Sequence, residues 1–287
     1  MPTTLASVGR PSPSVQEGHD HRGVTALPFV ATGAEALFRV TPVTGDATHG
    51  TSTMTTGPWL SDERGIPCRG ALGVLMDDVT GDPITARAPA GHWSVTTELH
   101  LDFSRSPALD GSILRAESEV VAVDPDGGLA SGRIVDESGR VVAIGSARLR
   151  FVAAEIPSRS LPDDITWAGA GACSIIELLG AHHRRDNASA GLELEPSESL
   201  RNPLGNVHGG VLLCASEIAG HSAVTAEAEF RTTSIAMSYA RPCPGTEPIT
   251  FAPRVIYRGR TFAVVQVVGR NHSGKTCTTA TVTCHRA

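Results

Sequence analysis

Two stretches of the chain alternate between polar and apolar residues and then stop shortly before a proline. The first runs from Ser94 to Phe103 and the second from Thr232 to Tyr239. Alternation with a period of two is typical of a half-buried β-strand. Each stretch is followed by another strand-like segment, at 113–123 and at 249–257. The same sequence of predicted strands therefore occurs twice.

Each alternating stretch is preceded by an apolar run with a glycine at its second position. Residues 69–78 read Arg-Gly-Ala-Leu-Gly-Val-Leu-Met-Asp-Asp, and residues 208–217 read His-Gly-Gly-Val-Leu-Leu-Cys-Ala-Ser-Glu. Both runs place a carboxylate nine residues after their start. Ser-Gly dipeptides, which favour turns, follow at 138–139 and at 273–274. Several matches in the same order indicate an internal duplication.

Each half is therefore expected to form one helix followed by an antiparallel meander of about four strands, which is an α+β arrangement. Leading strands are expected at 36–43 and 190–195, and a short helix at 174–183. Two such units are expected to pack together as a pseudo-dimer within one chain. The predicted boundaries are a disordered tail at 1–25, a first domain at 26–152, a linker at 153–171 and a second domain at 172–287.

Composition narrows the classes of protein to consider. The formal net charge is −6, from 24 basic and 30 acidic residues, which argues against binding nucleic acid by bulk charge. No run of 18 apolar residues is present, so no membrane span is expected, and the first residues lack the apolar core of a secretory signal. The six cysteines form no Cys-x-x-Cys pair. These features predict a cytoplasmic protein with reduced thiols and no structural zinc.

The triplet His208-Gly209-Gly210 stands directly before an apolar run, which indicates the N-terminus of a helix. Glycine leaves backbone N–H groups open to a ligand, and the helix dipole adds positive potential at that end. These donors would suit an oxyanion hole for acyl transfer. The turn-rich segment before the triplet would bring the side chain of Asn202 near the same helix end.

Such a site also needs an acid. Glu217 lies seven residues beyond Gly210, roughly 10 Å along a helix, and so cannot serve its own N-terminus. If the two helices pack side by side and antiparallel, the acid of each lies beside the N-terminus of the other. This predicts that Asp78 serves the Gly210 end and that Glu217 faces Arg69. Glu217 is either a second catalytic acid or an interfacial acid paired with Arg69.

The pattern Asn202-x-x-Gly205-x-x-His208-Gly209-Gly210, with an acid nine residues after the histidine, resembles the PaaI-type hotdog-fold acyl-CoA thioesterases. The likeness extends over most of residues 35–150 and 172–285. It implies two tandem hotdog domains, each a central helix wrapped by an antiparallel sheet. It also implies hydrolysis of acyl-CoA to free acid and CoA, with no metal or redox cofactor, and association into a homo-oligomer.

The resemblance also implies roles for individual residues. Asn202 and His208 would orient the thioester, and the backbone of the two glycines would polarise its carbonyl. Asp78 would act as nucleophile or as general base on water, and Thr97 would hydrogen-bond the acid. The site residues predicted in this way are Asp78, Thr97, Asn202, His208, Gly209, Gly210 and Glu217.

Two other functions remain open from the sequence. One is a non-catalytic acyl-CoA-binding or regulatory module, because the first half lacks the His-Gly-Gly triplet. The other is an enoyl-CoA hydratase or dehydratase on the same fold.

Overall fold

The computed structural model describes residues 33–154, 171–186, 189–225 and 230–286. The predicted tail at 1–25 and most of the predicted linker lie outside the described residues, so these boundaries stay predictions. In the first half, the helices and strands in chain order are α1 (Ala34–Leu37), β1 (Thr44–Gly45), β2 (His49–Thr55), η1 (Pro58–Leu60), η2 (Arg69–Ala71), α2 (Leu72–Thr85), β3 (His92–Phe103), β4 (Ile113–Asp124), β5 (Gly127–Val135) and β6 (Val141–Ala153).

The second half repeats this order. Its elements are α3 (Ile175–Leu179), β7 (Ala181–Asp186), β8 (Ser189–Leu194), η3 (Glu198–Leu200), α4 (Gly209–Ser222), β9 (Phe230–Tyr239), β10 (Ile249–Arg258), β11 (Phe262–Arg270) and β12 (Thr276–Arg286). The expected helix-and-meander arrangement of each half is confirmed.

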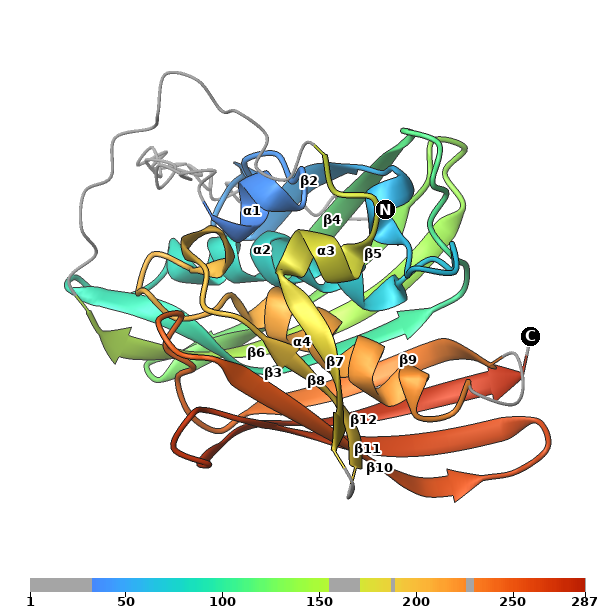
Figure 1. The fold of residues 1–287 in the computed structure, drawn as a ribbon. Helices are drawn as coiled ribbons and strands as arrows, with labels where there is room; N and C mark the ends of the chain where they lie inside the picture. The colour runs from blue at the N-terminus through green and yellow to red at the C-terminus, as the bar shows by residue number, and fades with distance from the viewer. Residues whose placement is uncertain (1–32, 155–170, 187–188, 226–229, 287) are drawn as a thin grey trace, which may run out of the picture.

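All the strands described form a single antiparallel sheet of 12 strands, in the order β1-β2-β4-β5-β6-β3-β9-β12-β11-β10-β8-β7. Strands β3 and β9 join the halves, with Leu101 opposite Ile235. On β3, Leu99 and Leu101 are buried while Glu98 lies on the exposed face, as the alternation predicts. Each half wraps its own long helix, and α2 and α4 pack against each other in the interior (Figure 1). The tandem hotdog α+β fold is therefore confirmed.

Two expected elements differ from the structure. Residues 36–43 were expected to form a strand, but α1 occupies the start of that segment and the leading strand is β2. The segment that begins at Ala36 is rich in apolar residues, but it is too short for their spacing to distinguish a short helix from a strand. The helix expected at 174–183 ends at Leu179, because Gly180 adopts a left-handed conformation with φ of 60° and β7 then begins.

Close contact between the long helices depends on glycine. A Cβ at Gly210 would lie 2.4 Å from the backbone of Val74, and a Cβ at Gly70 would lie 2.6 Å from the Cβ of Glu217. These distances are too short for any side chain, so each helix start can approach the other helix only without a Cβ. The glycines thus serve packing as well as any exposure of backbone amides.

Candidate active site

Asp77 is the carboxylate that reaches the N-terminus of α4. Its Oδ2 accepts a hydrogen bond from the Gly210 N–H at 3.1 Å, and its Oδ1 accepts one from the Thr96 hydroxyl at 2.7 Å. Asp77 is only 7% exposed. Burial raises the pKa of Asp77, whereas the charge on His208 and these two hydrogen bonds act in the opposite direction. An acid of the first half therefore lies against the helix start of the second.

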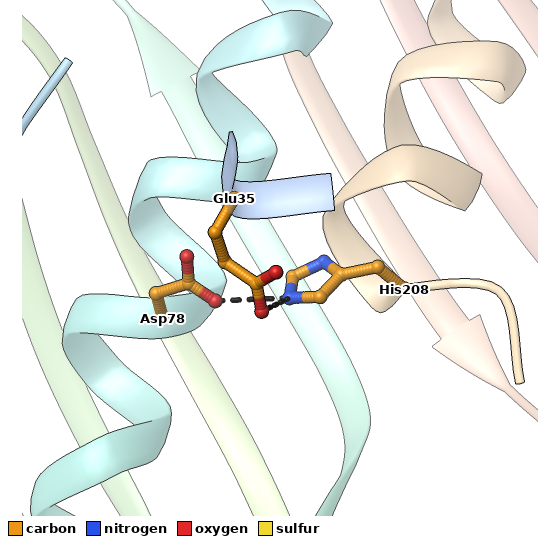
Figure 2. Close-up of side chains that lie close together, drawn as sticks. All are labelled: Glu35, Asp78 and His208. Atoms are coloured by element: carbon orange, nitrogen blue, oxygen red, sulfur yellow. Dashed lines mark hydrogen bonds and ion pairs between the residues drawn. The ribbon is translucent and has the colours of Figure 1, made fainter. Parts of the chain in front are cut away.

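His208 lies between this acid and two more. Its Nε2 is 2.9 Å from Asp78 Oδ1 and 3.8 Å from Glu35 Oε1, and its Nδ1 is 3.5 Å from Asp77 Oδ2. Figure 2 shows the Glu35 and Asp78 carboxyl groups approaching one ring nitrogen from different helices. Burial by itself lowers the pKa of His208, but the three acids outweigh it and raise the value to about 10. The ring is therefore charged at neutral pH.

The Nε2 atom of His208 carries a proton in either charge state. When the ring is neutral, Nδ1 is the acceptor for the Gly210 N–H, at 3.1 Å, so the proton is on Nε2 and points to Asp78. When the ring is charged, both nitrogens are donors. His208 therefore donates to Asp78 in both charge states, whereas its Nδ1 accepts from the Gly210 N–H only when the ring is neutral.

Beside this buried cluster, Gly209 offers a free donor. Its N–H has no hydrogen-bond partner among the described residues, and the residue is partly exposed. The Gly209 carbonyl accepts a hydrogen bond from the Tyr239 hydroxyl at 2.8 Å, which fixes the peptide at the start of α4. An unpaired N–H at a helix N-terminus is a suitable donor to a developing oxyanion.

We use the term front site for Asp77, Thr96, His208, Gly209 and Gly210. A related arrangement, the back site, occurs where α4 reaches the start of α2, and it comprises Cys68, Arg69, Gly70, Glu217 and Thr232. The corresponding positions differ by 140 residues: 77 and 217, 68 and 208, 70 and 210. The alignment of Arg69 with His208 in the sequence gives a spacing of 139 residues and therefore selects Asp78. The contact between the helices selects Asp77.

The back site is closed by its own side chains. Glu217 accepts hydrogen bonds from the Cys68 thiol, at 2.9 Å, and from the Thr232 hydroxyl, so both of its oxygens are engaged. Arg69, only 5% exposed, donates to the Thr232 carbonyl at 2.8 Å and to the Ser106 hydroxyl at 2.9 Å. No direct Arg69–Glu217 hydrogen bond or ion pair is found in the described part of the chain. The thiol replaces the histidine, and a guanidinium fills the space beside the helix start.

Two predicted site residues lie away from the acid. The Thr97 hydroxyl donates to the Arg148 carbonyl at 3.0 Å, because an irregularity in the β3–β6 register at this point turns Thr96 toward Asp77 in its place. Asn202 Oδ1 accepts from the Leu204 and Asn206 amides, at 3.0 and 3.2 Å. Asn202 therefore shapes the loop before His208 and has no described contact with the acids.

One group of donors in this cluster satisfies the spacing of a metal site. Potential ligand atoms of Glu35, Asp78 and His208 all lie within 4.8 Å of one another. The other group with such spacing in the described residues, His182, Glu193 and Glu195, is on the surface. Because Nε2 of His208 carries a proton directed at Asp78, the buried group presents a hydrogen-bond donor where a metal would need a lone pair.

Two family models match the chain. A family model of the acyl-CoA thioesterase N-terminal domain matches residues 199–285, and one of the acyl-CoA thioesterase C-terminal domain matches residues 9–146. Together these matches span well over half of the chain. The chain belongs to the acyl-CoA thioesterase family. This thioesterase is a thioester hydrolase of the hotdog fold, and its two domains occur in the reverse of the order that the family descriptions give.

Solved structures share the fold of the thioesterase at low sequence identity. The tesB protein of Mycobacterium avium subsp. paratuberculosis is 10% identical with a TM-score of 0.60, covering 88% of this chain and 98% of that one. Acyl-CoA thioesterase II TesB2 of Mycobacterium marinum is 11% identical with a TM-score of 0.56, covering 88% and 96%. The 12:0-ACP thioesterase of Umbellularia californica is 11% identical with a TM-score of 0.58, covering 83% and 94%. No curated protein matches the sequence. In the described part of the thioesterase, no helix has the length and apolar character to cross a membrane.

Three residues of this region were not predicted from the sequence: Asp77 and Thr96 of the front site, and Glu35 beside His208. Asp77 is adjacent to the predicted acid, and Thr96 is adjacent to the predicted threonine, so the signal was present but shifted by one position. Glu35 had no signal, because it precedes the segment expected to be a strand and its partner His208 is far away in the sequence.

Proposed function

We propose that the thioesterase hydrolyses acyl-CoA at one composite site, the front site, built by both halves of the chain. The observation that carries the proposal is the hydrogen bond from the Gly210 amide to the Asp77 carboxylate, which brings an acid and a helix N-terminus from different halves together. The spacing of Asn202, Gly205 and His208 supports a PaaI-type assignment within the family.

Asp77 is proposed as the reacting acid, either as general base on water or as nucleophile. As a base, its carboxylate accepts a proton from water, and the resulting hydroxide attacks the thioester carbonyl carbon. The negative charge on the carbonyl oxygen is stabilised by the Gly209 N–H. When the C–S bond breaks, CoA leaves as the thiolate and takes up the proton held by Asp77. Thr96 fixes the orientation of the carboxylate throughout, through its hydrogen bond to Oδ1.

His208 and Asp78 are proposed to support this acid. The charged ring beside Asp77 favours the ionised carboxylate and so opposes the effect of burial on its pKa. Asp78 accepts the Nε2 proton and holds the ring in place. Asp78 therefore acts through His208, in contrast to the direct role expected from the sequence. Asn202 acts one step further away, by shaping the loop that ends at His208.

The proposal is tested by measuring free CoA released from a panel of acyl-CoAs by the wild type and by Asp77→Asn. We expect hydrolysis by the wild type and, for the variant, retained binding with hydrolysis reduced by about 10²- to 10⁴-fold, the range of general acid–base catalysis. Binding without hydrolysis by the wild type would contradict the proposal and favour a binding module. Loss of the enoyl absorbance without CoA release would favour a hydratase.

A further inference from the structure

Glu35 is a buried acid that the hydrolysis scheme does not use. It lies on α1, outside the two long helices, and its residue is 6% exposed. Its Oε1 is 3.8 Å from His208 Nε2, while its Oε2 is buried without a hydrogen-bond partner in the described part of the chain. Asp78 Oδ2 is in the same condition. Each of the two carboxyl groups that approach this ring nitrogen thus keeps its other oxygen buried and unpaired.

This environment disfavours an ionised Glu35. Asp77 and Asp78 lie on the adjacent helix and face the same ring, and Asp82 follows one turn later on α2. Among the described residues, His208 is the one cationic side chain that pairs with Glu35, Asp77 and Asp78. Burial first, and then repulsion from Asp78, raise the pKa of Glu35 to about 8, although His208 acts in the opposite direction. A proton on Glu35 removes one negative charge and gives the carboxyl group a donor.

We propose that Glu35 is a positioning residue of the hydrolase site. Together with Asp78 it holds the His208 ring in place, and it does so as a neutral carboxylic acid. The ring in turn places Nδ1 at the start of α4, 3.1 Å from the Gly210 nitrogen and 3.5 Å from Asp77 Oδ2. Ionisation of Glu35 would add a third negative charge to this cluster, and its repulsion with Asp78 would loosen the arrangement. The kinetic consequences of this inference rest on the proposed function of the front site, whereas the placement of the ring does not.

The experiment compares Glu35→Gln with Glu35→Ala. Glutamine retains the size of the Glu35 side chain and a neutral group with a hydrogen-bond donor, whereas alanine removes the group that contacts the His208 ring. At pH 7 we expect kcat of Glu35→Gln within about threefold of wild type and kcat of Glu35→Ala lower by about tenfold or more, with KM changed little. Above pH 8 the wild type should lose activity, and Glu35→Gln should not. Equal losses for both variants at pH 7, or no loss for either, would overturn the proposal.

Asp82→Asn is the matched control, because it places a neutral amide in the same buried region away from the ring. The pKa of Asp82 is also raised, to about 7, by burial and by Asp78. We expect Asp82→Asn to keep wild-type kcat and to retain the decline above pH 8. If the decline disappears in Asp82→Asn and persists in Glu35→Gln, the titrating group is Asp82 and the proposal is wrong.

A measurement independent of turnover separates this inference from the proposed function. Nitrogen-15 NMR should show a slowly exchanging His208 Nε2–H in the wild type and in Glu35→Gln, but not in Glu35→Ala. Its absence from the wild type, or a stoichiometric divalent metal in the purified wild type that is lost in Glu35→Gln, would overturn the proposal even in an active enzyme. Full activity of Asp77→Asn would instead contradict the proposed function and leave the NMR result unaffected.

Discussion

The front and back sites occupy related positions but differ in what fills them. In both, a carboxylate from one long helix meets the start of the other and accepts a hydrogen bond from a threonine hydroxyl. The front site places a charged histidine and the unpaired Gly209 amide beside its acid, whereas the back site places a thiol and a buried guanidinium there. A carboxylate and a helix N-terminus are therefore present twice, but the partly exposed Gly209 gives the front site an accessible donor, whereas Arg69 and Gly70 at the start of the other helix are buried.

The largest expected effect contrasts the two acids. Asp77→Asn should lower kcat by about 10²- to 10⁴-fold, because it removes the proposed base or nucleophile. Glu217→Gln should change kcat by less than about threefold, since the back site has a thiol and a buried guanidinium where the front site has the histidine and the partly exposed Gly209 amide. Steady-state CoA release measures both variants. Similar losses in the two would show that the back site is also active.

The next contrast concerns the two residues that precede the helix starts. His208→Ala removes the cation from a group of buried acids and should lower the free energy of unfolding by about 3–5 kcal/mol. Cys68→Ala removes one thiol hydrogen bond and should cost about 1 kcal/mol. Chemical denaturation at pH 7 measures both values. Equal costs would mean that the His208 ring contributes no more than a neutral cap.

The two threonines offer a smaller contrast. Thr96→Val should reduce kcat by about tenfold, which corresponds to an activation free energy higher by about 1.4 kcal/mol, because the carboxylate of Asp77 is no longer held in orientation. Thr232→Val should reduce stability and leave kcat near wild type. Thr97→Val is the neighbouring control, because its hydroxyl contacts only the Arg148 carbonyl in the described structure. A larger kinetic effect for Thr97→Val than for Thr96→Val would contradict the strand register that places Thr96 on the acid.

The smallest contrast is a pH dependence of stability. The pKa of Glu35 is about 8 in the folded protein and ordinarily about 4.5, so its contribution is full below pH 4.5 and is lost as the pH rises through 8. Among the described residues, no second carboxyl group contacts the back-site acid. Between pH 4.5 and 8, Glu35→Gln should gain stability relative to wild type by more than about 1.4 kcal/mol, the equivalent of one pKa unit. Urea unfolding of both proteins across this range measures the trend, and parallel curves for the two would contradict it.

The sequence was sufficient to predict the duplicated fold because hydrophobic alternation and turn dipeptides are local signals that recur in both halves. It was also sufficient to place an acid of the first half at the helix start of the second, because a helix cannot bring Glu217 back to its own N-terminus. It could not distinguish Asp77 from Asp78, since pairing Arg69 with His208 shifts the alignment of the halves by one residue, whereas the helix contacts pair Cys68 with His208 and Gly70 with Gly210.

Contacts between distant segments were beyond the sequence for a different reason. The approach of Glu35 to His208 depends on how α1 packs against the two long helices, and no local pattern encodes that distance. The choice of Thr96 over Thr97 depends on one irregularity in strand pairing. Each half supplies its own helix and strands, and the site forms where the halves meet. The reversed order of the two family domains is consistent with this arrangement.

The central claim is that a thioester binds across the two halves at the front site. A crystal structure of Asp77→Asn with an intact acyl-CoA tests it most directly. We expect one thioester per chain, with its carbonyl oxygen accepting a hydrogen bond from the Gly209 amide and its carbonyl carbon facing the substituted side chain. A thioester bound at the Arg69–Gly70 end, or away from both helix starts, would contradict it.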